Sequence, residues 1–171
     1  MRFQRQWPDA IIGGTGTPFV HTVEDRIGDY ENYDYSGYPD FRDSIGFTQR
    51  GCRLKCKFCV VPTKEGKNRS VNPIYAIWRG EPYPRHLNLL DNDFFGQSEW
   101  RERVKEIRDG DFKVCLQQGI NVRLIDDESA AALSSIQYRD TKFKERRLYT
   151  AWDNLKDEGV FFKGVDTLEK A

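Results

Sequence analysis

The sequence has few of the features that mark a membrane, secreted or nucleic-acid-binding protein. Its 171 residues include only four cysteines and two histidines, and 27 basic residues balance 27 acidic ones. The net charge is zero and nothing in the sequence resembles a polybasic footprint, so binding of nucleic acid is unsupported, though not excluded. No apolar run approaches the roughly 18 residues of a membrane span, and the amino terminus lacks the apolar core of a signal peptide. We therefore expect a cytoplasmic protein with no membrane partner.

Three of the four cysteines lie close together, as Cys52, Cys56 and Cys59 in a Cys-x3-Cys-x2-Cys pattern. Such uneven spacing fits a reducing compartment and metal binding better than a secreted disulfide framework. Soft thiolate ligands suit zinc, Cu(I) and iron-sulfur clusters about equally well. The pattern therefore predicts a metal site on one short loop.

The number of ligands separates these metals. Structural zinc takes four protein ligands, and the remaining candidates are Cys115, His86 and His21. Cys115 lies in an apolar run, 112–116, that is typical of a buried strand, where free cysteine behaves as a small hydrophobe. A 4Fe-4S cluster is normally held by four cysteines. Three cysteines would leave one iron without a protein ligand and able to bind a small molecule.

From Ser44 onward the pattern predicts alternating strands and helices. Strands are expected at 45–48, 86–90, 112–116 and 147–151, with a short extra strand at 160–162. Helices are expected to begin at Asn72-Pro73, at Ser98 as N-cap, at Asp126 or Asp127, and near Asp166, and Gly110 should end the second of them. This alternation favours parallel βα units.

Polar residues follow the predicted strands at 91–93, 117–123 and 152–154, and the cysteine loop follows the first strand. Ligands of parallel α/β folds bind at the carboxyl ends of the strands. We therefore expect these segments to line a shared pocket.

Residues 8–18 are expected to form a short buried strand and a glycine-rich turn. A phosphate site would need a helix directly after this turn, and no helical pattern follows. Residues 28–44 contain four tyrosines among turn-forming residues. We interpret them as an irregular linker that packs on the next domain.

The string GFTQRGC..KCKFCVVP.KEGK, residues 46–67, resembles the cluster loop of radical S-adenosylmethionine (radical SAM) enzymes. It is most similar to a branch in which a cobalamin-binding-like domain precedes the barrel. The resemblance implies an α/β fold, a partial (β/α)6 barrel of about four βα units with parallel strands, over residues 44–171. Residues 1–43 would be a remnant strand of a Rossmann-like domain plus the linker, so the chain resembles a piece truncated at both ends. Cobalamin is not expected, because the Asp-x-His-x-x-Gly string is absent.

The resemblance also implies cofactors and their ligands. Cys52, Cys56 and Cys59 would bind a 4Fe-4S cluster, whose open iron binds S-adenosylmethionine and cleaves it to a 5'-deoxyadenosyl radical. Phe58 would lie near the adenine. Asp91, Asn92 and Asp93 would take the place of the family's Gly-Gly-Glu motif and receive the methionine amino group, and Arg123 would pair with the methionine carboxylate. The alternatives are that residues 91–93 only turn and cap the chain and that Arg123 forms a surface salt bridge.

Two other hypotheses remain: a non-catalytic iron-sulfur or zinc-binding module, and an inactive fragment. The sequence indicates neither the substrate nor the reaction type, and the catalytic residues remain unknown. A radical SAM enzyme would also need an electron donor as partner. An open parallel sheet exposes unpaired backbone groups at its edges, so we expect self-association or completion by another chain.

Overall fold

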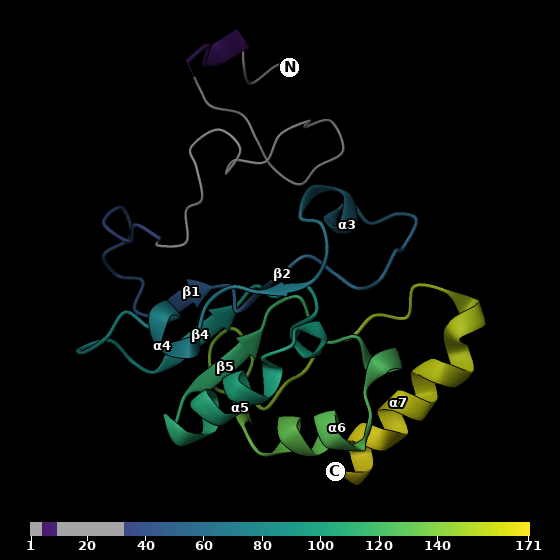
Figure 1. Ribbon diagram of the computed structural model, residues 1–171. Coiled ribbons are helices and arrows are strands. Elements are labelled where there is room, and N and C mark those ends of the chain that lie inside the picture. Colours follow the sequence, from purple (N-terminus) through teal and green to yellow (C-terminus); the bar gives the residue numbers. More distant parts are fainter. Residues whose placement is uncertain (1–4, 10–32) are drawn as a thin grey trace.

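The computed structural model describes residues 5–9 and 33–171, where short strands alternate with helices (Figure 1). The strands are β1 (Ser44–Gly46), β2 (Gln49–Arg50), β3 (Arg69–Ser70), β4 (His86–Leu89), β5 (Lys113–Leu116) and β6 (Gln137–Tyr138). The helices are α3 (Val61–Lys64), α4 (Ile74–Ile77), α5 (Trp100–Asp109), α6 (Asp127–Ser134) and α7 (Glu158–Lys170). Short 3-10 turns are η1 (Phe94–Gly96), η2 (Val122–Leu124) and η3 (Leu155–Asp157). The strand and glycine-rich turn predicted at 8–18 fall almost wholly outside the described residues, as does His21.

The main sheet has four parallel strands in the order β1-β4-β5-β6. Ser44 pairs with Leu87, Leu87 with Val114 and Val114 with Tyr138, so the strands are aligned along their length. This confirms the predicted α/β class with parallel strands. Because the strands run the same way, the segments that follow β1, β4 and β5 all leave the sheet at its carboxyl edge.

The fourth strand was predicted in the wrong place. The strand that pairs with β5 is β6, and residues 147–151 form no strand. The Tyr149 carbonyl instead accepts a hydrogen bond from the Ile120 N–H at 2.9 Å. This segment is therefore bonded to the loop that follows β5, and its apolar pattern does not reflect a place in the sheet.

The extra strand predicted at 160–162 was also wrong, because these residues lie in α7. This helix begins at Glu158, eight residues before the expected start at Asp166. Phe161, Gly164 and Leu168 recur at helical spacing and are its less exposed positions, whereas Val160 and Phe162 are exposed. The helical period therefore extends through the short apolar run.

The ends of the other helices follow the sequence in part. Asp126 caps α6 in a capping box with Ser129, as expected, and Gly110 ends α5. Ser98 is not the cap of α5, since Glu99 holds that position without a side-chain bond. Asn72 does not cap α4 either, because its side-chain amide donates to the Phe47 carbonyl at 3.0 Å.

The core lies between the sheet and the helices α4, α5 and α6. On α5, Trp100, Val104 and Ile107 occupy the predicted buried face. Further buried members from the strands and the two remaining helices include Ile74, Leu87, Leu89, Val114, Leu116 and Leu133, and Phe94 and Phe112 add aromatic rings from η1 and the residue before β5. The helices α5, α6 and α7 contact one another in sequence along the sheet (Figure 1). Within the described part of the chain, no helix has the length and apolarity needed to cross a membrane.

Candidate metal and cofactor site

The cysteine loop is closed at its base by a short ladder. Gln49 and Arg50 of β2 pair antiparallel with Ser70 and Arg69 of β3, so both ends of the excursion 51–68 leave from neighbouring points. Gly51 stands at this base with a φ of +77°, and a Cβ atom there would lie 2.3 Å from the Lys67 carbonyl oxygen. Only glycine fits both this conformation and this close approach.

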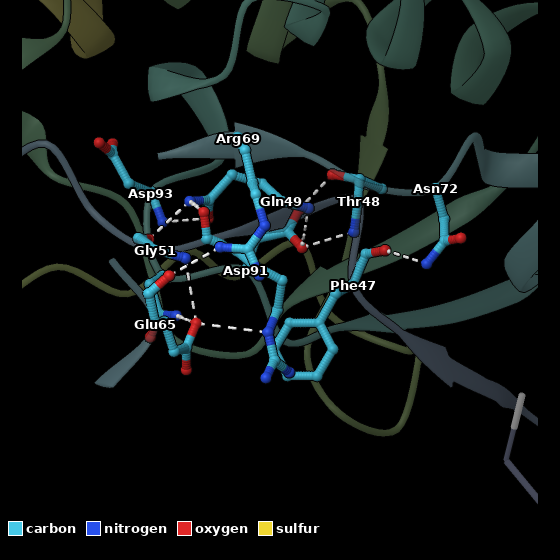
Figure 2. A network of polar contacts seen from close by, with 11 residues as sticks. Phe47, Thr48, Gln49, Gly51, Glu65, Arg69, Asn72, Asp91 and Asp93 are labelled. Carbon is cyan, nitrogen blue, oxygen red and sulfur yellow. Dashed lines mark hydrogen bonds and ion pairs between the residues drawn. The ribbon is translucent and has the colours of Figure 1, made fainter. Parts of the chain in front are cut away.

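Glu65 binds the loop to the carboxyl end of β4. Its carboxylate accepts from the Gly51 N–H at 3.0 Å and from the Asn92 side-chain amide at 3.1 Å, and Arg50 lies 3.4 Å away. Figure 2 shows Glu65 beside Gly51 in this network. One acidic side chain of the loop thus fixes both its own base and the segment after β4.

Asp93 provides a second attachment. Its carboxylate accepts from the Arg53 guanidinium through Nε at 2.8 Å and Nη2 at 3.2 Å, and from the Asn68 amide at 3.2 Å. Its backbone N–H donates to the Gln49 side-chain oxygen at 2.9 Å. Only 3% of the Asp93 side chain is exposed, so its negative charge is directed into this contact.

Asp91 is buried beneath the loop. Its carboxylate accepts from the Thr48 N–H at 2.7 Å, the Thr48 hydroxyl at 2.5 Å and the Gln49 N–H at 3.1 Å (Figure 2). Burial raises the pKa of Asp91 to about 7, although the three hydrogen bonds limit the rise. Asp91 therefore joins β4 to the turn between β1 and β2.

Above this network lies an open cavity of about 310 Å³ at the carboxyl edge of the sheet. Its walls come from four parts of the chain: the cysteine loop, the segment after β4, the segment after β5 and the residues just after Tyr149. The lining residues are Cys52, Leu54, Cys56, Phe58, Cys59, Val61, Asn92, Gln118, Gly119, Ile120, Asn121, Arg123, Ala151 and Asp153. The predicted meeting of the cysteine loop with residues from 91–93, 117–123 and 152–154 is thus present.

The three loop cysteines are half-buried on this cavity. Burial raises the pKa of the Cys52 thiol, with smaller upward contributions from the charges of Asp93, Cys59 and Cys56. The Leu54 N–H donates to the Cys52 sulfur at 3.4 Å, and this bond lowers the pKa.

In residues 5–9 and 33–171, no group of three or more His, Cys, Asp or Glu side chains is close enough to hold one metal ion.

The other predicted ligands divide into two groups. Phe58, Asn92 and Arg123 line the cavity, and Phe58 is 72% exposed. Asp91 and Asp93 do not line it, because their carboxylates accept bonds from the protein itself. Their placement does not support the predicted contact with a methionine amino group, which stays a prediction.

Two of the alternative zinc ligands, Cys115 and His86, are among the described residues, and both lie away from the cavity. Cys115 is buried in β5, where burial raises the pKa of its thiol. His86 contacts Asp43 at 3.0 Å and stacks on Phe143. Neither side chain lines the cavity.

Arg123 lines the cavity and is also bonded to side chains of the protein, so its pairing with a methionine carboxylate stays a prediction. Its guanidinium donates to the Asn121 side-chain oxygen at 3.0 Å and to Asp157 at 2.5 Å. Burial alone lowers the pKa of Arg123, but its interactions with Asp157 and Cys56 outweigh this effect and raise it. The sequence did not indicate Asp157, nor the anchoring residues Glu65 and Arg53, because each forms pairs with residues distant in the chain.

The three thiols of the loop are of the ligand type that binds iron-sulfur clusters. They line a cavity that also holds polar side chains, and a backbone N–H donates to one sulfur, but in the described residues they are not grouped closely enough to hold a single metal ion. No family model, curated protein or solved structure matches this chain.

Proposed function

We propose that this chain is a radical SAM protein that binds a 4Fe-4S cluster through Cys52, Cys56 and Cys59. The observation that carries the proposal is the gathering of these cysteines with Phe58, Asn92 and Arg123 around one cavity at the carboxyl edge of a parallel sheet. As part of this proposal, the sheet belongs to a partial (β/α)6 barrel. The proposed setting is the cytoplasm, where thiols stay reduced.

When bound, the cluster supplies one electron and an iron with an open position, at which S-adenosylmethionine is reductively cleaved. The residues of the chain bind and orient. Phe58 offers an exposed aromatic ring to the adenine, and Asn92 offers an amide at the end of β4, fixed by Glu65. Gln118, Asn121 and Asp153 add polar groups on the opposite segments of the cavity.

A second candidate, a non-catalytic iron-sulfur module, is favoured by one observation. Asp91 and Asp93, which would receive the methionine amino group, are bonded to Thr48, Gln49, Arg53 and Asn68. In this alternative the cavity holds a cluster and no S-adenosylmethionine.

One experiment separates the two candidates. The chain is reconstituted anaerobically, and iron and sulfide are counted; a colourless product containing zinc would refute both. S-adenosylmethionine and dithionite are then added, and 5'-deoxyadenosine and methionine are quantified. Equal amounts of the two products support the enzyme, since one sulfonium bond breaks per event. A full cluster that binds no S-adenosylmethionine supports the module.

A further inference from the structure

Arg123 occupies a fixed position between the cavity and the carboxy-terminal helix. It lies in η2, next to Val122, whose side chain is 1% exposed. The turn packs on α7 at Gly164, where a Cβ atom would lie 2.0 Å from the Val122 carbonyl oxygen. This approach is possible only at glycine, so α7 holds the backbone of η2 at a set distance.

The Arg123 side chain is fixed as well. Nε donates to Asn121 and Nη1 donates to Asp157, the residue directly before α7. Arginine carries five N–H donors in a rigid planar fork, so these two bonds set the direction of the donors that remain.

Cys52, Cys56 and Cys59 line the same cavity as this fork. Among them Cys56 interacts electrostatically with Arg123, which helps to raise the pKa of Arg123. Arg123 and Asp153 are the only charged side chains among the lining residues. The positive charge therefore lies on the wall of the cavity that the three cysteines line, and it comes from a different part of the chain.

We propose that Arg123 is a positioning residue, held by Asp157 next to α7, whose positive charge on the cavity wall raises the reduction potential of a cluster bound by the loop cysteines. This inference rests on the proposed function, and it gives Arg123 a role that needs no contact with S-adenosylmethionine.

The physical reason is electrostatic. Reduction adds one negative charge to a cluster, and net charge and hydrogen bonds at the sulfurs are principal determinants of its potential. A guanidinium on the wall of the cluster cavity favours the reduced form. The bond to Asp157 keeps the guanidinium in place and also offsets part of its charge, so the three variants below separate position from charge.

The test measures the reduction potential of the reconstituted chain, without S-adenosylmethionine, by a dithionite titration followed by electron paramagnetic resonance. The variants are Arg123→Gln, Arg123→Lys and Asp157→Asn. Arg101→Gln is the matched control, because Arg101 forms a comparable fork with Glu128 on the exposed face of α5. Iron is counted in every sample.

For Arg123→Gln we expect the reduced-to-oxidised ratio at a fixed potential to fall about tenfold, equivalent to a shift of about 59 mV to more negative potential. Arg123→Lys, which keeps the charge without the fork, should show a smaller fall. In the metal-free chain, Asp157→Asn should increase amide hydrogen exchange in residues 53–58, and Arg101→Gln should change neither measurement.

The outcomes are distinguishable. If the wild type binds a full cluster and Arg123→Gln leaves its potential unchanged, the inference is overturned and the proposed function stands. If the wild type binds no cluster, both are overturned. If Arg123→Gln weakens only S-adenosylmethionine binding, Arg123 is a ligand of that cofactor and the positioning role is refuted.

Discussion

Asp91 accepts hydrogen bonds from both the backbone N–H and the hydroxyl of Thr48, a residue 43 positions earlier in the chain. This pair joins the carboxyl ends of two neighbouring parallel strands directly beneath the cysteine loop. A buried carboxyl with three protein donors is a structural group, and its ionisation affects the stability of the fold.

Asp91 should make stability depend on pH. Its folded-state pKa is raised from the ordinary 3.8 to about 7, so the folded state binds the proton more tightly than the unfolded state between these values. Its contribution to the free energy of unfolding is therefore lost as pH rises through this window, by up to roughly 1.4 kcal/mol per unit. Urea unfolding of wild type and Asp91→Asn from pH 4 to 8 should show that the unfolding free energy of the wild type falls, relative to that of the variant, as the pH rises. A difference that stays constant with pH would contradict this.

Gly51→Ala should destabilise the cysteine loop more than Gly66→Ala. Both glycines have positive φ, +77° and +78°, so both variants carry the same conformational cost. Only at Gly51 does the added Cβ meet backbone, 2.3 Å from the Lys67 oxygen, whereas nothing lies within 4 Å at Gly66. We expect about 1 to 3 kcal/mol of strain for Gly51→Ala beyond the shared cost. Equal unfolding free energies for the two variants would show that the ladder at the loop base can shift freely.

Asp93→Asn should lower the yield of assembled cluster. The substitution removes the negative charge that holds Arg53, which lies next to Cys52 in the loop, at a cost on the order of 1 to 3 kcal/mol. Iron counting after reconstitution measures the effect, with Glu145→Gln as control because Glu145 forms an exposed pair with Arg147. If Asp93→Asn keeps a full cluster and loses only S-adenosylmethionine binding, Asp93 contacts the cofactor after all.

The cysteines should differ in their effect on the cluster. Cys52→Ala, Cys56→Ala and Cys59→Ala should each abolish its broad visible absorption, because each removes a thiolate ligand. Cys115→Ala should keep it, since Cys115 is buried in β5 away from the cavity. Equal loss in all four variants would mean four cysteine ligands and no open iron.

The chain should associate with itself. Large apolar side chains are exposed near the end of the chain: Tyr149, Trp152, Leu155, Val160 and Phe162. Leu155 is the most exposed, at 82%, and Leu155→Lys should shift sedimentation toward the monomer. Thr141→Lys, at an exposed polar position in the loop after β6, is the control. A wild type that sediments as a monomer at all concentrations would refute this prediction.

The sequence was informative where a pattern is local. The cysteine spacing and the alternation of strands and helices were enough to predict one edge where Cys56, Asn92 and Arg123 meet, since parallel strands end on the same side. The hydrogen bonds of Asp91 and Asp93 to other parts of the protein could not be predicted from the sequence, because their partners Thr48 and Arg53 lie 43 and 40 positions away. An aspartate after a strand has the same local signature whether it faces a ligand or the protein.

The misplaced fourth strand has a similar cause. Residues 147–151 carry a strand-like apolar pattern, but β6 formed from the less apolar Gln137 and Tyr138. The fourth strand forms from the segment that reaches the edge of β5 directly after α6, and the strand preferences of single residues do not contain that information.

The short ladder between β2 and β3 closes the cysteine excursion at its base, so its length can vary between the anchoring residues Arg53 and Glu65. Because Arg50 and Arg69 are paired neighbours, residues inserted or removed between them change the length of a closed loop without moving β1 or β4. Lengthening a closed loop costs only about 0.6 kcal/mol per doubling. The spacing around the cysteines can therefore evolve, or be redesigned for another cofactor, while the parallel sheet beneath remains the same.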